Sequence, residues 1–268
     1  MTMAPMLQFE AGTVAENYRR YLEPVLFAPW AERLVAHAAV RRGDVVVDIA
    51  SGTGAAARAA ARAAGPLGHV IATDISASML AYADSAARPD SAVIEARVGS
   101  ALALDIADAS ADVVLCQQGL QFMDDQVAVL RECRRILRPG GVIAMAVWAA
   151  GERLDPFDVF ADALSTAERE LSNSSVTMSV MSVVDALCMS GFAEISASTH
   201  SLIVRWPTLD SEIGALFGTP FGPLVERMRD EERSALLVNL RELLGEGGER
   251  TRDHLTRAVF GRGSKPLH

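Results

Sequence analysis

A short apolar segment leads directly into a glycine loop near residue 50. Val45–Ile49 is a β-branched run, and Ser51-Gly52-Thr53-Gly54 follows it and opens an alanine-rich segment. Glycine has no Cβ atom, so a ligand can lie against the backbone of such a loop, and the first turn of a following helix offers free amide donors. The pattern predicts a strand, a loop and a helix in that order, with a planar or carboxylate-bearing ligand on the loop.

A carboxylate just before the loop narrows the choice of ligand. Gly52, Gly54 and Ala57 also satisfy the G-x-G-x-x-A pattern of dinucleotide-binding oxidoreductases, so the glycine spacing alone leaves that class open. Asp48, however, disfavours a pyrophosphate at the loop and suits a cation such as an ammonium or a sulfonium. We therefore favour S-adenosylmethionine, which carries both cations, over a nicotinamide dinucleotide.

A second acidic residue, Asp74, follows Gly54 by twenty residues and ends the next apolar run. Its two oxygens can accept hydrogen bonds from both hydroxyls of a ribose, which either cofactor contains. Asp74 could instead cap the next helix, but Ser76 is equally suited to that position. We expect Asp74 to bind the ribose.

The elements that position these residues alternate between strand and helix. Alternation of this kind predicts a parallel sheet with helices on both faces. We expect strands near 45–49, 70–73, 92–96, 112–116 and 141–148, helices near 55–64, 78–87 and 125–137, then a long strand over 195–206, helices within 208–244 and a last strand near 254–261. The expected fold class is α/β: one Rossmann-like, doubly wound, seven-stranded and mostly parallel sheet with helical lid insertions.

Within this single domain of residues 1–268, three parts are expected. Residues 1–42 would form N-terminal lid helices, 43–150 the cofactor-binding core, and 151–268 the acceptor-side insertions with the last two strands. Pro24 and Pro29 are expected to break the N-terminal segment into two or three short helices.

Four ordered segments resemble the class I S-adenosylmethionine-dependent methyltransferases. They are VVDIASGTG, IATDIS, VGSALAL, and DVVLCQQGLQFMDD followed by LRECRRILRPGGVIAMAVW. The chain is most similar to the type 11 group that includes ubiquinone and menaquinone C-methyltransferases and many natural-product enzymes, and the likeness covers about 15–148. It departs from the family at Ala50 and Ser51, where glycine and cysteine are common, and at Ser100, where an acidic residue is common.

The resemblance implies a role for each matched residue. Gln118 is the candidate catalytic residue, as a polar group near the transferred methyl. Gln117 would face the amino group of the cofactor. The implied cofactor-binding set is Tyr18, Asp48, Ala50, Gly52, Gly54, Asp74, Ile75, Met79, Ser100, Ala101, Leu102 and Gln117, and the implied acceptor contacts are Tyr21, Trp30, Phe122 and Trp148. For Tyr18, Tyr21 and Trp30, plain packing of aromatic residues at helical spacing is an equal alternative.

Composition excludes several classes of function. Thirty-four acidic against 25 basic side chains give a net charge of -9, which argues against nucleic acid as a partner. The three cysteines have neither the number of a disulfide framework nor the spacing of a zinc site, so no metal is expected and a cytoplasmic location fits. No apolar run is long enough to span a membrane. The oligomeric state stays open, with a homodimer as one option.

The expected activity is therefore methyl transfer to a small, largely apolar acceptor, in natural-product or other secondary metabolism. One alternative is a protein that binds S-adenosylmethionine but catalyses a non-methylating rearrangement. A second, less favoured alternative is an NAD-dependent oxidoreductase, which would use a Tyr-Lys pair, whereas Lys265 is the only lysine in the chain. No histidine adjoins a cofactor motif, so the sequence assigns no general base.

Overall fold

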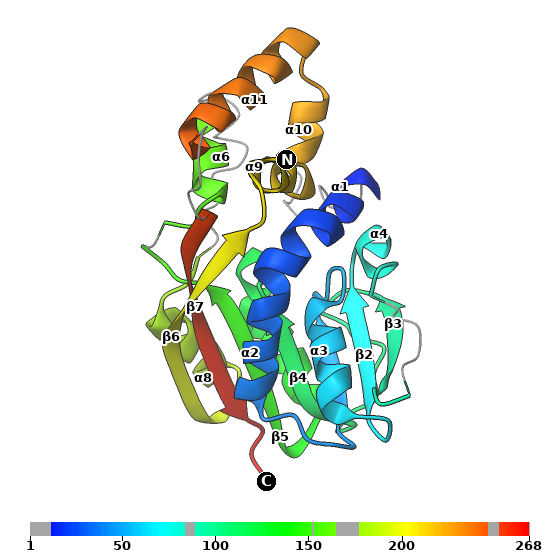
Figure 1. Ribbon diagram of the computed structural model, residues 1–268. Coiled ribbons are helices and arrows are strands. Elements are labelled where there is room, and N and C mark those ends of the chain that lie inside the picture. The colour runs from blue at the N-terminus through cyan, green and yellow to red at the C-terminus, as the bar shows by residue number, and fades with distance from the viewer. Residues whose placement is uncertain (1–11, 84–88, 152, 165–176, 246–251, 268) are drawn as a thin grey trace.

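A computed structural model describes residues 12–83, 89–151, 153–164, 177–245 and 252–267. Within these residues the strands form one seven-stranded sheet in the order β3-β2-β1-β4-β5-β7-β6 (Figure 1). The strands are β1 (Val45–Ile49), β2 (His69–Asp74), β3 (Val93–Val98), β4 (Ala111–Gln117), β5 (Leu137–Trp148), β6 (Ala193–Trp206) and β7 (Arg252–Ser264). β1 to β5 are parallel, and β7 runs antiparallel to both β5 and β6. The expected α/β fold class is confirmed.

Helices cover both faces of this sheet, because each face carries buried apolar side chains. The helices of the core are α2 (Ala28–Ala38), α3 (Ala55–Ala64), α4 (Ala77–Leu80), the short 3₁₀ turn η3 (Leu120–Phe122), α5 (Gln126–Ile136) and α8 (Val180–Met189). α2 and α3 pack on one face and α5 and α8 on the other, which gives two apolar core clusters (Figure 1). The alanines of α3 let that helix approach the sheet closely.

The N-terminal segment forms a helical arm, residues 12–38, without the breaks expected from its prolines. It consists of α1 (Gly12–Asn17), the π-helix η2 (Tyr18–Phe27) and α2. Pro24 lies inside η2, and Pro29 follows the junction at the start of α2. The residues at both junctions, Asn17 and Ala28, have right-handed helical dihedrals, so the arm is one continuous helical path.

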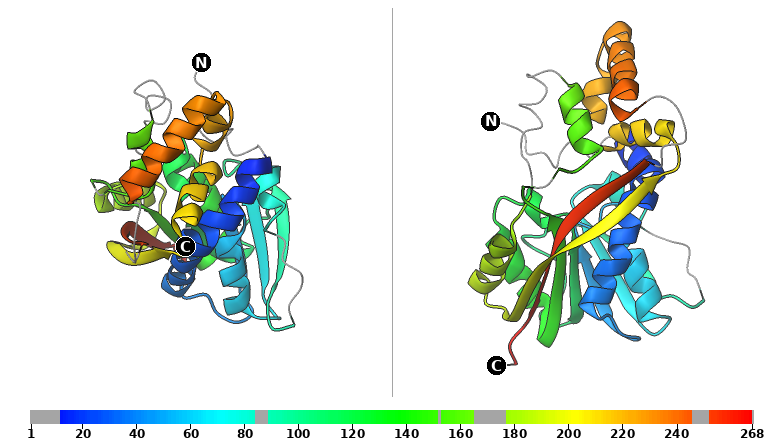
Figure 2. Two further views of the ribbon diagram at one scale, coloured as in Figure 1. Left: turned by 45° about the horizontal axis from the view of Figure 1, so that its top comes forward. Right: turned by 60° about the vertical axis from the view of Figure 1, so that its left-hand side comes forward.

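A group of helices, the cap, lies beyond the carboxyl ends of the parallel strands (Figure 2). It consists of α6 (Phe157–Ala163), α9 (Leu209–Gly214), η4 (Ala215–Gly218), α10 (Gly222–Glu226) and α11 (Asp230–Leu244). The fully buried Glu212 of α9 fastens it to β7, since its carboxylate lies 2.7 Å from Arg252 and 2.5 Å from His254. None of the helices in the described part of the chain has both the length and the apolar character needed to cross a membrane.

Candidate functional site

The glycine loop has the backbone conformation that its residue types predict. Gly52 and Gly54 have φ of +55° and +85°, in the left-handed region. A Cβ on Gly54 would lie 2.6 Å from the Cα of Ala83, so the loop packs too tightly there for any side chain. A Cβ on Gly52 would lie 3.5 Å from the terminal methyl of Met79, so Met79 lies beside the loop. Ala50 also has a positive φ, of +50°.

Asp48 is a buried carboxylate directly below this loop. Ser51 Oγ donates a 2.6 Å hydrogen bond to its Oδ2, whereas Oδ1 is buried with no hydrogen-bond partner among the described residues. Burial raises the pKa of Asp48 to about 7, while the Ser51 hydrogen bond, the backbone N–H of Ala57 and the charge of Arg58 act in the opposite direction. A buried carboxylate oxygen without a donor is a strong site for a cation that brings its own N–H groups.

Asp74 bridges the glycine loop and the start of α4. Its Oδ2 accepts from Gly52 N at 2.7 Å and its Oδ1 from Ser76 N at 2.8 Å. Ser76, not Asp74, is the N-cap of α4, since its hydroxyl accepts from Met79 N at 3.3 Å. Burial raises the pKa of Asp74, opposed by these backbone donors. Ile75, next to it, is 46% exposed and therefore available to a ligand.

Three glutamines gather at the end of β4. Gln117 Nε2 donates to Phe27 O of the arm at 2.8 Å, and its Oε1 is buried without a described partner. Gln118 has a φ of +53°, and its backbone N–H donates to Ala146 O at 2.7 Å. Its side chain pairs with that of Gln121, whose Nε2 donates to Gln118 Oε1 at 3.1 Å. Gly119 between them packs on the loop, because a Cβ there would lie 2.5 Å from that of Ala50.

One hydrogen-bond donor and one acceptor of the Gln118–Gln121 pair have no partner among the described residues. Gln118 Nε2 and Gln121 Oε1 are buried and have no hydrogen-bond partner in the described chain. If both amides were turned over, the remaining atoms would again be one donor and one acceptor, so this property does not depend on amide orientation. Sequence reasoning missed Gln121, since a glutamine in a one-turn helix carries no spacing signal.

Tyr18 of the arm lies close to both carboxylates. Its pKa is raised well above the ordinary value, first by burial and then by the charges of Glu23, Asp74 and Asp48. Its ring stacks on Phe27, with the centroids 4.7 Å apart. Residues nine positions apart point to opposite sides of an α-helix. The wider i→i+5 turn of η2 brings the two rings to one side instead.

The expected acceptor residues divide into two groups. Trp30 is fully buried and donates from Nε1 to Thr256 Oγ1 at 3.1 Å, so its surroundings are those of a core residue. Tyr21 packs against the cap, where a Cβ on Gly214 would meet its ring at 3.0 Å. Trp148, at the end of β5, lies 6.2 Å from the ring of Phe27. Phe122 is half-buried in η3. Trp148 and Phe122 are thus the two that stand nearest to the strand ends carrying the site.

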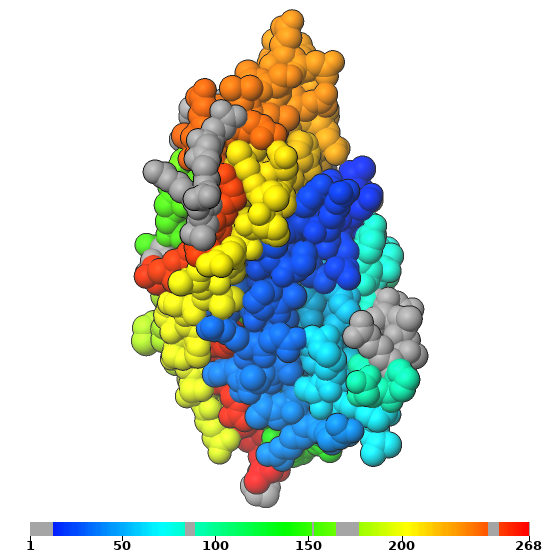
Figure 3. All heavy atoms as spheres, viewed as in Figure 1, coloured from blue at the N-terminus to red at the C-terminus, as the bar shows by residue number. Residues whose placement is uncertain are grey.

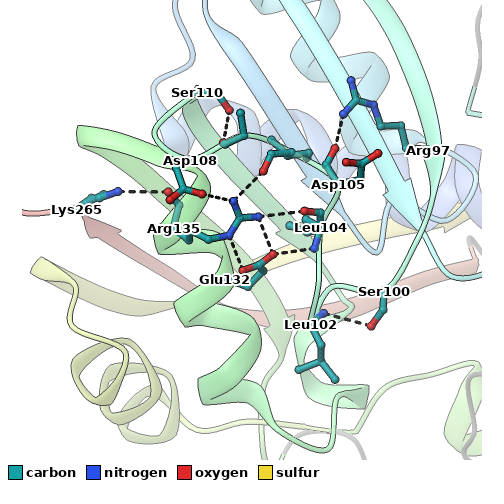
Figure 4. A network of polar contacts seen from close by, with 12 residues as sticks. Arg97, Ser100, Leu102, Leu104, Asp105, Asp108, Ser110, Glu132, Arg135 and Lys265 are labelled. Carbon is teal, nitrogen blue, oxygen red and sulfur yellow. Dashed lines mark hydrogen bonds and ion pairs between the residues drawn. The ribbon is translucent and has the colours of Figure 1, made fainter.

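The segment expected at the adenine, 100–102, begins a loop that α5 holds in place (Figure 4). Ser100 and Leu102 are exposed, and Leu102 N donates to Ser100 Oγ at 3.2 Å. Farther along the loop, Arg135 donates to Leu104 O and Ile106 O at 3.0 and 2.8 Å. Glu132 pairs with Arg135 and accepts from Leu104 N at 2.7 Å. This arginine therefore serves the fold of the loop and does not form an anion site.

Comparison with known proteins agrees with this geometry. A family model described as a methyltransferase domain matches residues 47–145, which contain both carboxylates, the glycine loop and the three glutamines. A ubiquinone/menaquinone biosynthesis C-methyltransferase of Burkholderia mallei is 37% identical over 132 residues, 48% of this chain and 54% of that protein. The chain thus contains a methyltransferase domain, over residues 47–145. It spans about half the length of the curated methyltransferases that it matches.

Solved structures share the fold of this chain at low identity. YcgJ of Bacillus subtilis has a TM-score of 0.54 at 18% identity, covering 88% of this chain and 97% of that one. A Haemonchus contortus phosphoethanolamine N-methyltransferase, solved with S-adenosylhomocysteine, has a TM-score of 0.55 at 17% identity, covering 89% and 52%. The [4+2]-cyclase SpnF has a TM-score of 0.54 at 19% identity, covering 88% and 80%. S-adenosylhomocysteine, which the Haemonchus enzyme holds, is the demethylated form of the cofactor expected for this chain, S-adenosylmethionine.

Proposed function

We propose that this chain transfers a methyl group from S-adenosylmethionine to a small, largely apolar acceptor in a biosynthetic pathway. The observation that carries the proposal is the buried Asp48 oxygen, which has no donor at hydrogen-bond distance among the described residues, directly below the glycine loop. When bound, S-adenosylmethionine supplies a methyl group already activated by its sulfonium. The protein then needs mainly to align the two reactants and exclude water.

The residues of the site suit the parts of that cofactor. Asp48 would receive the ammonium group, because its free oxygen lacks a donor and its charge is costly without a cation. Gly52 and Gly54 would lie against the methionine part. Asp74 would exchange its Gly52 amide for the ribose hydroxyls or share it with them. Ile75, with the 100–102 segment, would border the adenine.

On the acceptor side, we propose that the Gln118–Gln121 pair orients a group that both donates and accepts a hydrogen bond, such as a hydroxyl or an enol. Both side chains are more than nine-tenths buried, at 7% and 6% exposed, so a mismatched polar group there would be expensive. Phe27 and Trp148 would supply the apolar wall. The quinone-pathway relative makes phenols and quinols the first acceptors to test.

The test has two stages. Isothermal titration with S-adenosylhomocysteine should show saturable one-site binding, and lack of binding would refute the cofactor site. Incubation with methyl-labelled S-adenosylmethionine and phenol, quinol, polyketide and amine acceptors should then give a product heavier by one methylene unit.

One alternative rests on a specific observation. The [4+2]-cyclase SpnF shares this fold, so the fold also serves chemistry other than methylation. Binding of the nucleoside together with a product of unchanged mass, formed without release of S-adenosylhomocysteine, would favour that alternative.

A further inference from the structure

Glu23 is a buried carboxylate on the π-helix of the arm, outside residues 47–145, which the family model matches. Its side chain is 5% exposed. Thr53 Oγ1 donates to its Oε2 at 2.5 Å, and Arg58 Nη2 lies 2.5 Å from its Oε1. Arg19 adds a 3.1 Å contact from the same helix. Burying a charged carboxylate costs free energy unless such partners compensate it. Loss of these partners would therefore weaken the docking of η2 on the rest of the protein.

The two main partners of Glu23 belong to the cofactor site. Thr53 stands between Gly52 and Gly54, and is itself 1% exposed. Arg58, one turn into α3, also donates to Thr53 O at 2.7 Å and to Tyr82 O at 2.9 Å. Glu23 therefore joins the arm to the glycine loop, and Arg58 joins both to the segment that follows α4.

The same stretch of the arm carries Tyr18. Tyr18 and Glu23 both lie on η2, and α1, which leads directly into Tyr18, packs against α4 beside the glycine loop. The charges of Asp74 and Asp48 also raise the pKa of the phenol. The π-helical geometry aligns Tyr18 with Phe27, and Gln117 at the end of β4 holds the backbone of Phe27. Figure 3 shows the arm, in blue, as a continuous ridge between the yellow and orange cap segments and the cyan region of α3 and α4.

We propose that Glu23 is a positioning residue: its contacts with Thr53 and Arg58 dock the arm on the glycine loop and thereby hold Tyr18 at the cofactor site. Cofactor affinity then depends on Glu23 through Tyr18 and the loop. The proposal rests on the proposed function in taking the S-adenosyl nucleoside as the ligand.

The central experiment is a double-mutant cycle between Glu23→Gln and Tyr18→Phe, read by titration with S-adenosylhomocysteine. Glu23→Gln keeps the shape of the side chain and leaves the Arg58 charge without its partner. Because only the docked fraction binds, affinity should fall about tenfold or more. Tyr18→Phe alone should weaken binding about threefold or more. In the Glu23→Gln background it should add little, since the phenol is already displaced.

A matched control comes from the same pair of helices. Glu32 of α2 and Arg62 of α3 also form an ion pair between the arm and α3, but both side chains are about half exposed. Glu32→Gln should change affinity less than about twofold. In the ligand-free protein, hydrogen exchange of the 18–27 amides should be faster in Glu23→Gln than in Glu32→Gln.

The results distinguish a positioning role of Glu23 from a purely structural one. If Glu23→Gln binds S-adenosylhomocysteine like the Glu32→Gln control, with only a lower melting temperature, Glu23 is merely structural and the proposal is wrong. Effects of Glu23→Gln and Tyr18→Phe that multiply would also overturn it. If Glu23→Gln does not fold, Thr53→Val removes the hydroxyl at nearly constant shape and should show the same non-additivity. Failure of the unaltered protein to bind would refute the proposed function instead, and hydrogen exchange would still report on docking.

Discussion

Replacing Asp48 by asparagine should make the ligand-free protein more stable while weakening its affinity for the cofactor. Burial raises the pKa of Asp48 from 3.8 to about 7. The folded state therefore keeps this proton at pH values where the unfolded state has lost it. Stability falls as the pH rises from about 4 to about 7 and is then level. A difference of about 3 between the two pKa values corresponds to about 4 kcal/mol.

The net gain for Asp48→Asn at pH 8 is smaller than this figure. The asparagine can still accept the Ser51 hydrogen bond, but its amide stays buried without a described partner, at a cost of about 1–3 kcal/mol. A gain on the order of 1–3 kcal/mol remains, which should raise the melting temperature by a few degrees. Loss of the charge opposite a bound ammonium costs about 2 kcal/mol or more, so S-adenosylhomocysteine should bind about thirtyfold more weakly.

Thermal melts at pH 8 and titration calorimetry with S-adenosylhomocysteine at pH 6 and 7 provide the assay. In the unaltered protein the ligand requires ionised Asp48, so it should bind about fivefold more tightly at pH 7 than at pH 6. Asp48→Asn should not show this pH dependence of binding. Asp74 is present in both proteins, so its titration affects both alike and cancels in the comparison. An Asp48→Asn protein that is less stable at pH 8 and binds within threefold of the original would refute the reasoning.

Three further substitutions test the packing around the site. Gly218→Ala would place a methyl 2.6 Å from a backbone nitrogen of the arm; we expect a loss of about 1–3 kcal/mol in thermal melts, and an unchanged melting temperature would contradict this contact. Gly119→Ala would press on the Cβ of Ala50, so calorimetry should show S-adenosylhomocysteine binding about tenfold more weakly. Gly99→Ala is the neutral control, because a methyl there meets nothing within 4 Å. Gln118→Ala should lower turnover more than cofactor affinity in steady-state assays, and an equal rate and product yield would remove its proposed role.

The sheet and the carboxylates at its edge could be predicted from the sequence because their signals are local. β1 and the glycine loop follow from a β-branched run and two glycines, and Ser76 caps α4 as its residue type allows. The expected start of the fifth strand at Gly141 was late, since β5 begins at Leu137 and includes the glycine turn. The helix expected over 78–87 ends at Leu80 as α4, and 84–88 lie outside the described residues.

The features that could not be predicted depend on contacts between distant residues. Pro24 predicts a helix break, but it lies within the π-helix η2, where the neighbouring Glu23 binds Thr53, thirty residues away. Gln121 gains its place only through Gln118, and no periodic pattern marks it. Such contacts override local preference, and a single sequence contains no signal for them.

The position of β7 between β5 and β6 has a consequence for folding during synthesis on the ribosome. The chain leaves the ribosome from its N-terminus, so 193–206 emerges well before 252–264, the segment that must pair with it on one side and with β5 on the other. Until then both strands present unpaired backbone groups, which are sites for misassociation. The nascent protein can thus organise its nucleoside-binding half early. Strand β7 must then insert between β5 and β6, and this last pairing completes the sheet.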